Sequence, residues 1–172
     1  MGRDKALIEI DRVPLVQRVA AAIGEVCGSV SLVGDPALYG NLGFRVIPDL
    51  MPGEGPLAGI EAALGETKAE WNLVVACDMP ALDTRILEEL FVAAASNNGD
   101  CAAPQYSDGR MEPLCAVWNA RCHAEVVSAL ADGVRKVTEA LRRLALRYVP
   151  VASDAAFRNL NTPEDLERYG RG

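Results

Sequence analysis

The chain has 172 residues, 50% of them hydrophobic, and a formal net charge of −7 at pH 7. This length and apolar content suffice for one buried core, and no linker rich in proline, serine or glycine divides the sequence, so we expect a single domain over residues 1–172. The negative charge, without a clustered stripe of lysine and arginine, argues against a nucleic-acid partner.

The first residues and the cysteines bear on the compartment. The chain begins with charged side chains, which excludes a signal-peptide apolar region, and no segment approaches the ~20 apolar residues of a membrane span. The five cysteines form no C-x-x-C pair and lie within or beside apolar runs, as reduced core thiols do, which argues against structural zinc. We therefore expect a cytoplasmic protein with no membrane partner.

Hydrophobic periodicity, with proline and glycine as boundaries, predicts alternating helices and strands in the first half of the chain. In chain order these are a helix opened by Pro14 and closed by Gly28, a strand at 29–33, a turn or short helix at 36–42, a strand at 44–49, a helix starting near Pro56, and a strand at 72–76.

The second half continues in the same manner. It predicts a helix at 82–95, strands at 100–104 and 114–118 around a polar loop at 105–110, helices at 120–130 and 134–144, a strand at 146–151, and a terminal helix at 163–169 with Thr162 as N-cap. The sum is an α/β fold with three layers and a largely parallel sheet.

The start of the chain departs from this scheme. Parallel α/β domains usually begin with an apolar strand at a central sheet position that leads into a glycine-rich phosphate loop, whereas this chain opens with Met-Gly-Arg-Asp-Lys. A buried sheet without its central strand would leave unpaired backbone groups that cost about 1 to 3 kcal/mol each. We therefore expect that a first strand is missing and that the native chain extends upstream of Met1.

Asp78 is the leading catalytic candidate. It follows the apolar run at 73–77 and precedes Met79-Pro80, so it stands at the carboxyl end of a buried strand. Open α/β sheets bind their ligands at that end, where a carboxylate can hold a divalent cation beside phosphates. The alternative role for Asp78 is to cap the turn before the helix that begins near Asp83.

Three further features are weaker when taken singly. The segment Gly53-Glu54-Gly55-Pro56-Leu57-Ala58-Gly59 departs from G-x-G-x-x-G by one residue, but its backbone N–H groups at a helix start suit a base or phosphate. Asp49 ends a strand and would otherwise initiate a turn, and Lys5 would otherwise be a solvated surface residue. Two strand-end carboxylates and a glycine turn in one chain together favour a ligand site.

Two polar clusters stand next to prolines. They are Glu112-Pro113-Leu114 and Asn159-Leu160-Asn161-Thr162-Pro163. Asparagine side chains offer both donors and acceptors to a heterocycle, although the same residues also form caps and turns.

Five blocks in fixed order resemble the molybdenum cofactor guanylyltransferases. They are Met1-Gly2-Arg3-Asp4-Lys5-Ala6-Leu7, the segment from Pro48-Asp49 through Gly55-Pro56-Leu57-Ala58-Gly59, Ala76-Cys77-Asp78-Met79-Pro80, Glu112-Pro113-Leu114-Cys115-Ala116, and Asn159-Leu160-Asn161-Thr162-Pro163-Glu164-Asp165-Leu166. Together they cover nearly the whole chain. The Gly-Pro-Leu-Ala-Gly and Asn-Leu-Asn-Thr-Pro-Glu-Asp blocks separate this family from most other nucleotidyltransferases.

The resemblance implies a Rossmann-like nucleotidyltransferase fold and an activity, the transfer of GMP from GTP to molybdopterin with release of pyrophosphate. It further implies Mg²⁺ as cofactor, GTP and molybdopterin as substrates, and molybdoenzymes or their chaperones as partners. Carried onto matching positions, it assigns phosphate contacts to Lys5, guanosine binding to Asp49 and to Gly55, Pro56, Leu57, Ala58 and Gly59, the metal to Asp78, and the pterin side to Arg110, Glu112, Asn159 and Asn161.

Two departures from the family leave alternatives open. The family's apolar first strand and its Leu-Ala-Gly-Gly-x-Ser-x-Arg loop precede the Met-Gly-x-Asp-Lys segment, and this sequence starts where that loop ends; Gly34 stands where many members carry asparagine. The alternatives are a related transferase that uses CTP or another acceptor, and a catalytically inactive pterin-binding partner that lacks the phosphate loop.

Overall fold

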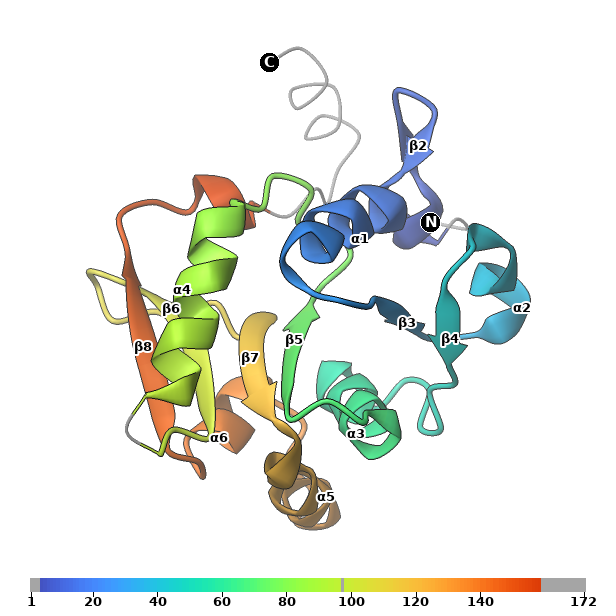
Figure 1. Ribbon diagram of the computed structural model, residues 1–172. Coiled ribbons are helices and arrows are strands. Elements are labelled where there is room, and N and C mark those ends of the chain that lie inside the picture. Colours follow the sequence, from blue (N-terminus) through green and yellow to red (C-terminus); the bar gives the residue numbers. More distant parts are fainter. Residues whose placement is uncertain (1–3, 97, 159–172) are drawn as a thin grey trace.

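A computed structural model describes residues 4–96 and 98–158 (Figure 1). The helices of four or more residues are α1 (Leu15–Val26), α2 (Pro36–Tyr39), α3 (Pro56–Glu66), α4 (Thr84–Ala95), α5 (His123–Ala131) and α6 (Val137–Leu141). The strands are β1 (Glu9–Ile10), β2 (Val13–Pro14), β3 (Ser31–Val33), β4 (Arg45–Ile47), β5 (Trp71–Val75), β6 (Cys101–Tyr106), β7 (Cys115–Asn119) and β8 (Leu146–Val151). Short 3₁₀ turns lie at Lys5–Leu7, Gly40–Leu42, Ala120–Cys122 and Ala155–Phe157.

The strands form a mixed arrangement. One sheet has the order β5-β7-β6-β8, β3 and β4 pair separately in parallel, and β1 and β2 form a small antiparallel hairpin that the sequence patterns did not predict. The pair β6–β8 is parallel, as expected, whereas β7 is antiparallel to both of its neighbours. The reason is the short connection at 107–114, because a parallel pair needs a crossover of about a dozen residues or more.

The expected three-layer α/β architecture is confirmed, with helices on both faces of the four-stranded sheet. Successive residues of β7 divide between two cores: Ala116 and Trp118 pack with helices α3, α5 and α6, whereas Cys115 and Val117 pack against helix α4. Every residue of β7 is buried. The alternation follows from the two-residue period of a strand, and it explains why this segment is apolar on both faces.

The predicted helix at 134–144 is wrong at both ends, since α6 covers only Val137–Leu141. Gly133 adopts a φ of 83°, which turns the chain after helix α5. The Arg135 side chain then donates to the Leu130 and Val134 carbonyl oxygens, both at 3.0 Å, and the extended backbone of Lys136 caps helix α6. Side-chain bonds to these carbonyls thus stabilise a non-helical connection, which the apolar spacing does not reveal.

The predicted terminal helix at 163–169 lies outside the described residues. Within the described ranges, no strand occupies the space between β3 and β5, and these two strands belong to separate sheets. The described helices include none with the length and apolar character that crossing a membrane would require.

Asp100 joins three strands of the large sheet. Its carboxylate accepts hydrogen bonds from the Ala145 N–H at 2.9 Å and from the Arg121 guanidinium at 2.8 Å, and its carbonyl oxygen accepts from the Asn119 N–H at 2.8 Å. The Ala145 bond, more than the Arg121 ion pair, lowers the pKa of the Asp100 carboxyl below its usual 3.8. The charged carboxylate therefore stabilises the fold.

We expect Asp100→Ala to lower the free energy of unfolding by about 1 to 3 kcal/mol at pH 7, the usual loss when a bonded polar group is removed. Because the folded-state pKa is depressed, the carboxylate's contribution is complete well above pH 3.8 and disappears as the pH falls through the folded-state value. Urea unfolding at pH 7 and at pH 3 checks both points. Glu88→Ala, at an exposed position of helix α4, is the control and should change little; an Asp100 effect that is equal at both pH values would contradict this account.

Candidate active site

Two carboxylates converge at one end of the β5–β7 pair. Val75 is opposite Cys115 in the register, and the ladder continues with a 2.8 Å bond from the Ala76 N–H to the Leu114 carbonyl oxygen. Because the strands are antiparallel, Asp78 leaves β5 at the same end at which Glu112 approaches β7. The Asp78 charge contributes to raising the pKa of the Glu112 carboxyl, so the two groups lie within electrostatic reach.

Asp78 carries a polar atom that has no partner. Among the described residues its Oδ1 is buried and makes no hydrogen bond. A buried carboxylate oxygen left unpaired costs free energy, and a cation offsets that cost. The described residues contain no group of three His, Cys, Asp or Glu side chains that could hold a metal, but Mg²⁺ commonly uses one or two carboxylates together with substrate phosphates and water. The donor set of Asp78 and Glu112 therefore fits Mg²⁺.

Lys5 stands beside the segment that leads to Asp78. Its charge lowers the pKa of the Cys77 thiol, against larger raising effects from burial, Asp78 and Asp4 that bring this pKa to about 11. Lys5 begins the 3₁₀ turn that Asp4 caps by accepting a 3.0 Å bond from the Ala6 N–H. The phosphate contact assigned to Lys5 and the metal role assigned to Asp78 stay predictions.

Asp4 is held in turn by Tyr39, a residue that the sequence reasoning missed. The Tyr39 hydroxyl donates to the second Asp4 oxygen at 2.5 Å. A Cβ at Gly34 would lie 2.5 Å from Cε2 of the Tyr39 ring, so only glycine leaves room for that ring. Two segments separated by more than 30 positions thus fix the Lys5 turn. No local pattern could have revealed the pair, although Gly34 at a strand tip was the available signal.

Asp49 initiates a turn, which was the alternative role that the sequence suggested for it. Its Oδ1 accepts from the Met51 N–H at 2.9 Å, an Asx turn after strand β4. One carboxylate oxygen is used in this way, and among the described residues no hydrogen bond or ion pair joins Asp49 to Asp78. Its predicted guanosine contact stays a prediction.

The glycine turn begins helix α3 as expected. Gly53 and Gly55 both have φ near 89°, Gly55 is the N-cap, and Pro56 is the first helical residue. Leu57 and Ala58, in contrast, are buried to 0% and 1% exposure, with Leu57 in the core cluster beneath the sheet. Side chains buried in this way cannot contact a nucleotide, so any contact from these two positions must come from the backbone.

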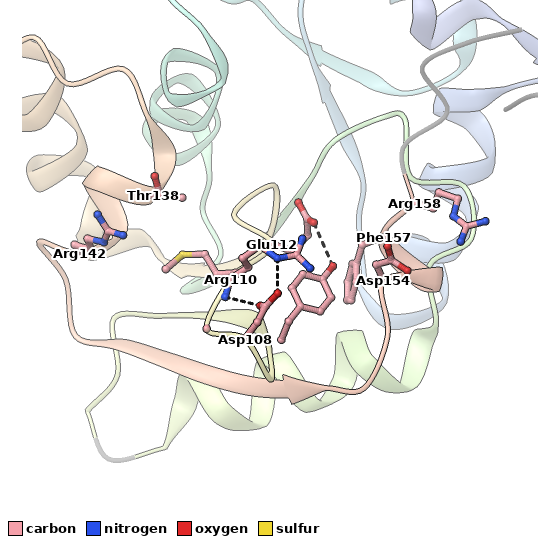
Figure 2. A pocket seen from close by; sticks show the side chains of 11 residues that line it. Asp108, Arg110, Glu112, Thr138, Arg142, Asp154, Phe157 and Arg158 are labelled. Carbon is pink, nitrogen blue, oxygen red and sulfur yellow. Dashed lines mark hydrogen bonds and ion pairs between the residues drawn. The ribbon is translucent and has the colours of Figure 1, made fainter. Parts of the chain in front are cut away.

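The predicted pterin-side residues Arg110 and Glu112 line one cavity of about 710 Å³ (Figure 2). Tyr106 lies between them: its hydroxyl is 3.4 Å from the Glu112 carboxylate, and the Arg110 guanidinium lies over its ring at 5.0 Å. The cavity also receives side chains that the sequence reasoning did not select, namely Thr138, Arg142, Asp154, Phe157 and Arg158.

Burial within this cavity raises the pKa values of two ionisable groups, Glu112 and Tyr106. Desolvation raises the pKa of the Glu112 carboxyl, against a lowering effect of the Tyr106 bond. Desolvation and the Glu112 charge raise the pKa of Tyr106 to about 12, so the hydroxyl stays a donor at neutral pH. Phe157 meets the Tyr106 ring edge-on, with centroids 6.3 Å apart. The cavity therefore combines an aromatic wall with arginines, a combination suited to a ring system that carries a phosphate.

The structure does not gather all the predicted residues into one cavity. Pro56 and Gly59 line a different cleft, between β3 and β5, and neither cavity lining includes Lys5, Asp49 or Asp78. Asn159 and Asn161 lie outside the described residues. Of the missed cavity residues, Tyr106 and Arg142 had only weak signals, because a strand-end tyrosine and a surface helix arginine are common.

Comparisons with known proteins are consistent with this arrangement. The family described as "MobA-like NTP transferase domain" matches residues 1–147. A probable molybdenum cofactor guanylyltransferase from Pelotomaculum thermopropionicum is 35% identical over 96% of this chain and 83% of its own length, and a molybdenum cofactor guanylyltransferase from Serratia proteamaculans is 33% identical over 98% and 86%.

A solved structure extends the likeness to three dimensions. The molybdopterin-guanine dinucleotide biosynthesis protein A from Archaeoglobus fulgidus superposes with a TM-score of 0.82 at 28% identity, covering 99% of this chain and 90% of that one. Sequence, fold and the order of the site blocks lead to the same assignment, so the chain belongs to the molybdenum cofactor guanylyltransferase family of MobA-like NTP transferase domains.

Proposed function

We propose that the protein transfers GMP from GTP to molybdopterin, giving the guanine dinucleotide form of the cofactor and pyrophosphate. The observation that carries the proposal is the family membership combined with the convergence of Asp78 and Glu112 at one sheet end. In this reaction a terminal phosphate oxygen of molybdopterin forms a bond to the α-phosphorus of GTP, and the bond from that phosphorus to the pyrophosphate breaks.

The main physical obstacle is charge repulsion, since two phosphate anions must meet beside protein carboxylates. Asp78, with Glu112 beside it, would hold Mg²⁺, which when bound neutralises phosphate charge and polarises phosphoryl oxygens. The Lys5 ammonium supplies a second positive charge close to Cys77 and Asp78. Without such cations the Asp78–Glu112 pair alone would repel both substrates.

The two substrates would approach from different segments. The start of helix α3 after Gly55 is the positive end of an 11-residue helix, which suits guanosine or its phosphates. Arg110, Arg142 and Arg158, which all line this cavity, suit the phosphate of the acceptor, and Tyr106 suits its ring (Figure 2).

The test supplies the protein with molybdopterin, Mg²⁺ and equal concentrations of GTP and CTP, and identifies the dinucleotide product by mass spectrometry. We expect the guanine product together with equimolar pyrophosphate. A product that is mainly the cytosine dinucleotide would show instead that the protein is a CTP-dependent transferase. Binding of pterin without any product would favour the inactive pterin-binding partner.

Asp78→Asn should lower kcat by about 100-fold or more, because the amide keeps the side-chain volume but loses the charge that holds the cation. The rate of pyrophosphate release measures this effect. A second readout needs no turnover: electron paramagnetic resonance of Mn²⁺ with GTP should show weaker metal binding in the variant. Asp83→Asn is the matched control, because Asp83 caps helix α4 through the Arg85 N–H and pairs with the exposed Arg85 guanidinium, and asparagine caps equally well. Normal turnover in the Asp78 variant would remove this carboxylate from the mechanism.

Tyr39→Phe should raise the KM for GTP by about 2- to 10-fold and leave kcat nearly unchanged, because loss of one hydrogen bond to Asp4 loosens the Lys5 turn. Steady-state kinetics at varied GTP give this split. Tyr148→Phe, at a 44% exposed position of β8, is the control. An equal fall in kcat and kcat/KM would show instead that the contact acts only in the transition state.

A further inference from the structure

Three carboxylates line the cavity shown in Figure 2, and they differ in what they bind. Asp108 pairs with the Arg110 guanidinium at 2.7 Å. Glu112 accepts from the Tyr106 hydroxyl, whose oxygen lies 3.4 Å away. The Asp154 carboxylate, in contrast, makes no hydrogen bond or ion pair with any of residues 4–96 and 98–158. Asp154 is therefore an acceptor in this cavity that the described part of the fold does not use.

The usual structural role of an aspartate at this position is absent. Asp154 stands at the N-cap of the 3₁₀ turn Ala155–Phe157, where an aspartate side chain normally accepts from a backbone N–H of the turn. Its backbone has φ −87° and ψ 1° instead of the extended angles typical of a cap, and its side chain makes no capping bond. The Ala155 N–H donates to the Ser153 hydroxyl at 3.3 Å, and the Phe157 N–H donates to the Asp154 carbonyl oxygen at 2.9 Å. Capping thus does not explain the carboxylate.

The core fixes where Asp154 lies. Tyr106 is opposite Val151 in the parallel β6–β8 pair, so the chain after β8 emerges at the same end of the sheet as the loop after β6. Phe157 is 3% exposed and belongs to the same core cluster as Val151, which anchors the turn that carries Asp154. Burial, the Glu112 charge and the Asp154 charge, in that order, raise the pKa of Tyr106 to about 12. Asp154 therefore lies within electrostatic reach of the Tyr106 hydroxyl.

The cavity presents different chemistry on its two sides. Figure 2 shows Asp154 beside Phe157, with Thr138 and Arg142 on the opposite side of Arg110. One side thus offers a carboxylate next to an aromatic ring, and the other offers a hydroxyl and a guanidinium. A ligand that suits both sides has a flat ring with N–H donors toward the acid and an anionic group toward the arginines.

A ring edge with two neighbouring N–H donors matches a carboxylate well, because each donor can bond to one of the two oxygens. The 2-amino-4-oxo-pyrimidine edge has this pattern, with an amino group beside a ring N–H. Both substrates of the proposed function carry it, molybdopterin in its pterin and GTP in its guanine. Because the arginines of this cavity suit the phosphate of the acceptor and the start of helix α3 suits GTP, the pterin is the occupant favoured here.

We propose that Asp154 accepts hydrogen bonds from the 2-amino group and the adjacent ring N–H of the pterin and thereby determines which pteridines the cavity binds. This assignment rests on the proposed function, which identifies the acceptor substrate as a pterin. A pteridine with oxygen at position 2 presents a lone pair to the carboxylate in place of a donor, so one hydrogen bond is lost and a repulsion is added. Such a ring is rejected, since a site that bonds a donor discriminates against an analogue without it.

The test measures binding without GTP and without turnover. The probes are the phosphate monoesters of 6-hydroxymethylpterin and of 6-hydroxymethyllumazine, which differ only in the amino or oxo group at position 2, and their own fluorescence reports binding. We expect the pterin ester to bind about 10-fold more tightly than the lumazine ester. Asp154→Asn should reduce this ratio to about threefold or less, because the amide can donate to a 2-oxo group as well as accept from a 2-amino group.

Ser153→Ala is the matched control, because it removes the hydroxyl that accepts from the Ala155 N–H in the same turn and keeps the Asp154 charge, so the ratio should stay unchanged. Asp154→Ala gives the same comparison if the asparagine variant fails to fold. Equal affinity for the two esters, no binding of either, an unchanged ratio in the Asp154 variants, or a lost ratio in the Ser153 variant would each overturn the proposal. Displacement of the pterin ester by GMP at comparable affinity would also overturn it, since guanine would then be the occupant.

Formation of the dinucleotide is measured separately, so that the two proposals can fail independently. A protein that forms no dinucleotide but prefers the pterin ester through Asp154 would defeat the proposed function and keep this inference. A protein that forms the guanine dinucleotide but binds both esters equally would defeat this inference alone.

Discussion

The antiparallel pairing of β5 with β7 is the constraint on which the site depends. Its register, with Val75 opposite Cys115, determines that the residues after β5 and the residues before β7 emerge together. A shift of one residue would turn Asp78 or Glu112 toward the other face of the sheet, because side chains alternate along a strand. The burial of every β7 side chain between two cores makes such a shift costly, so the core specifies the position of the carboxylates.

Sequence patterns predicted those parts of the fold that depend on local spacing. Helix α4 and strand β8 follow directly from apolar periodicity, and the three layers follow from the alternation of elements. The strand directions could not be predicted from apolar periodicity, because the orientation of β7 depends on the length of the connection at 107–114 between β6 and β7. The shortening of helix α6 depends on where the Arg135 guanidinium finds acceptors, which is a tertiary property.

For the site, Asp78 follows strand β5 as predicted, and its buried Oδ1 has no hydrogen-bond partner among the described residues, whereas its metal role stays a prediction. The same reasoning applied to Asp49 identified a position that forms an Asx turn. The contacts that position Lys5 could not be predicted, because Tyr39, in helix α2, and Asp4 are remote in the chain and meet only in the folded structure. The partners of individual side chains thus could be identified only from the structure, whereas the positions of strand ends could be predicted from the sequence.

Cys77 has a consequence for which metal the neighbouring acid can attract. A thiolate is a soft ligand that favours zinc or copper(I), and a cysteine directly before Asp78 would compete for such ions if it were ionised. Burial and the adjacent acids raise the pKa of this thiol to about 11, so it stays protonated under physiological conditions. In the metal role proposed for Asp78, the charged donors at this end of β5 are therefore carboxylate oxygens, and the protonated Cys77 thiol adds no anionic sulfur beside them at neutral pH.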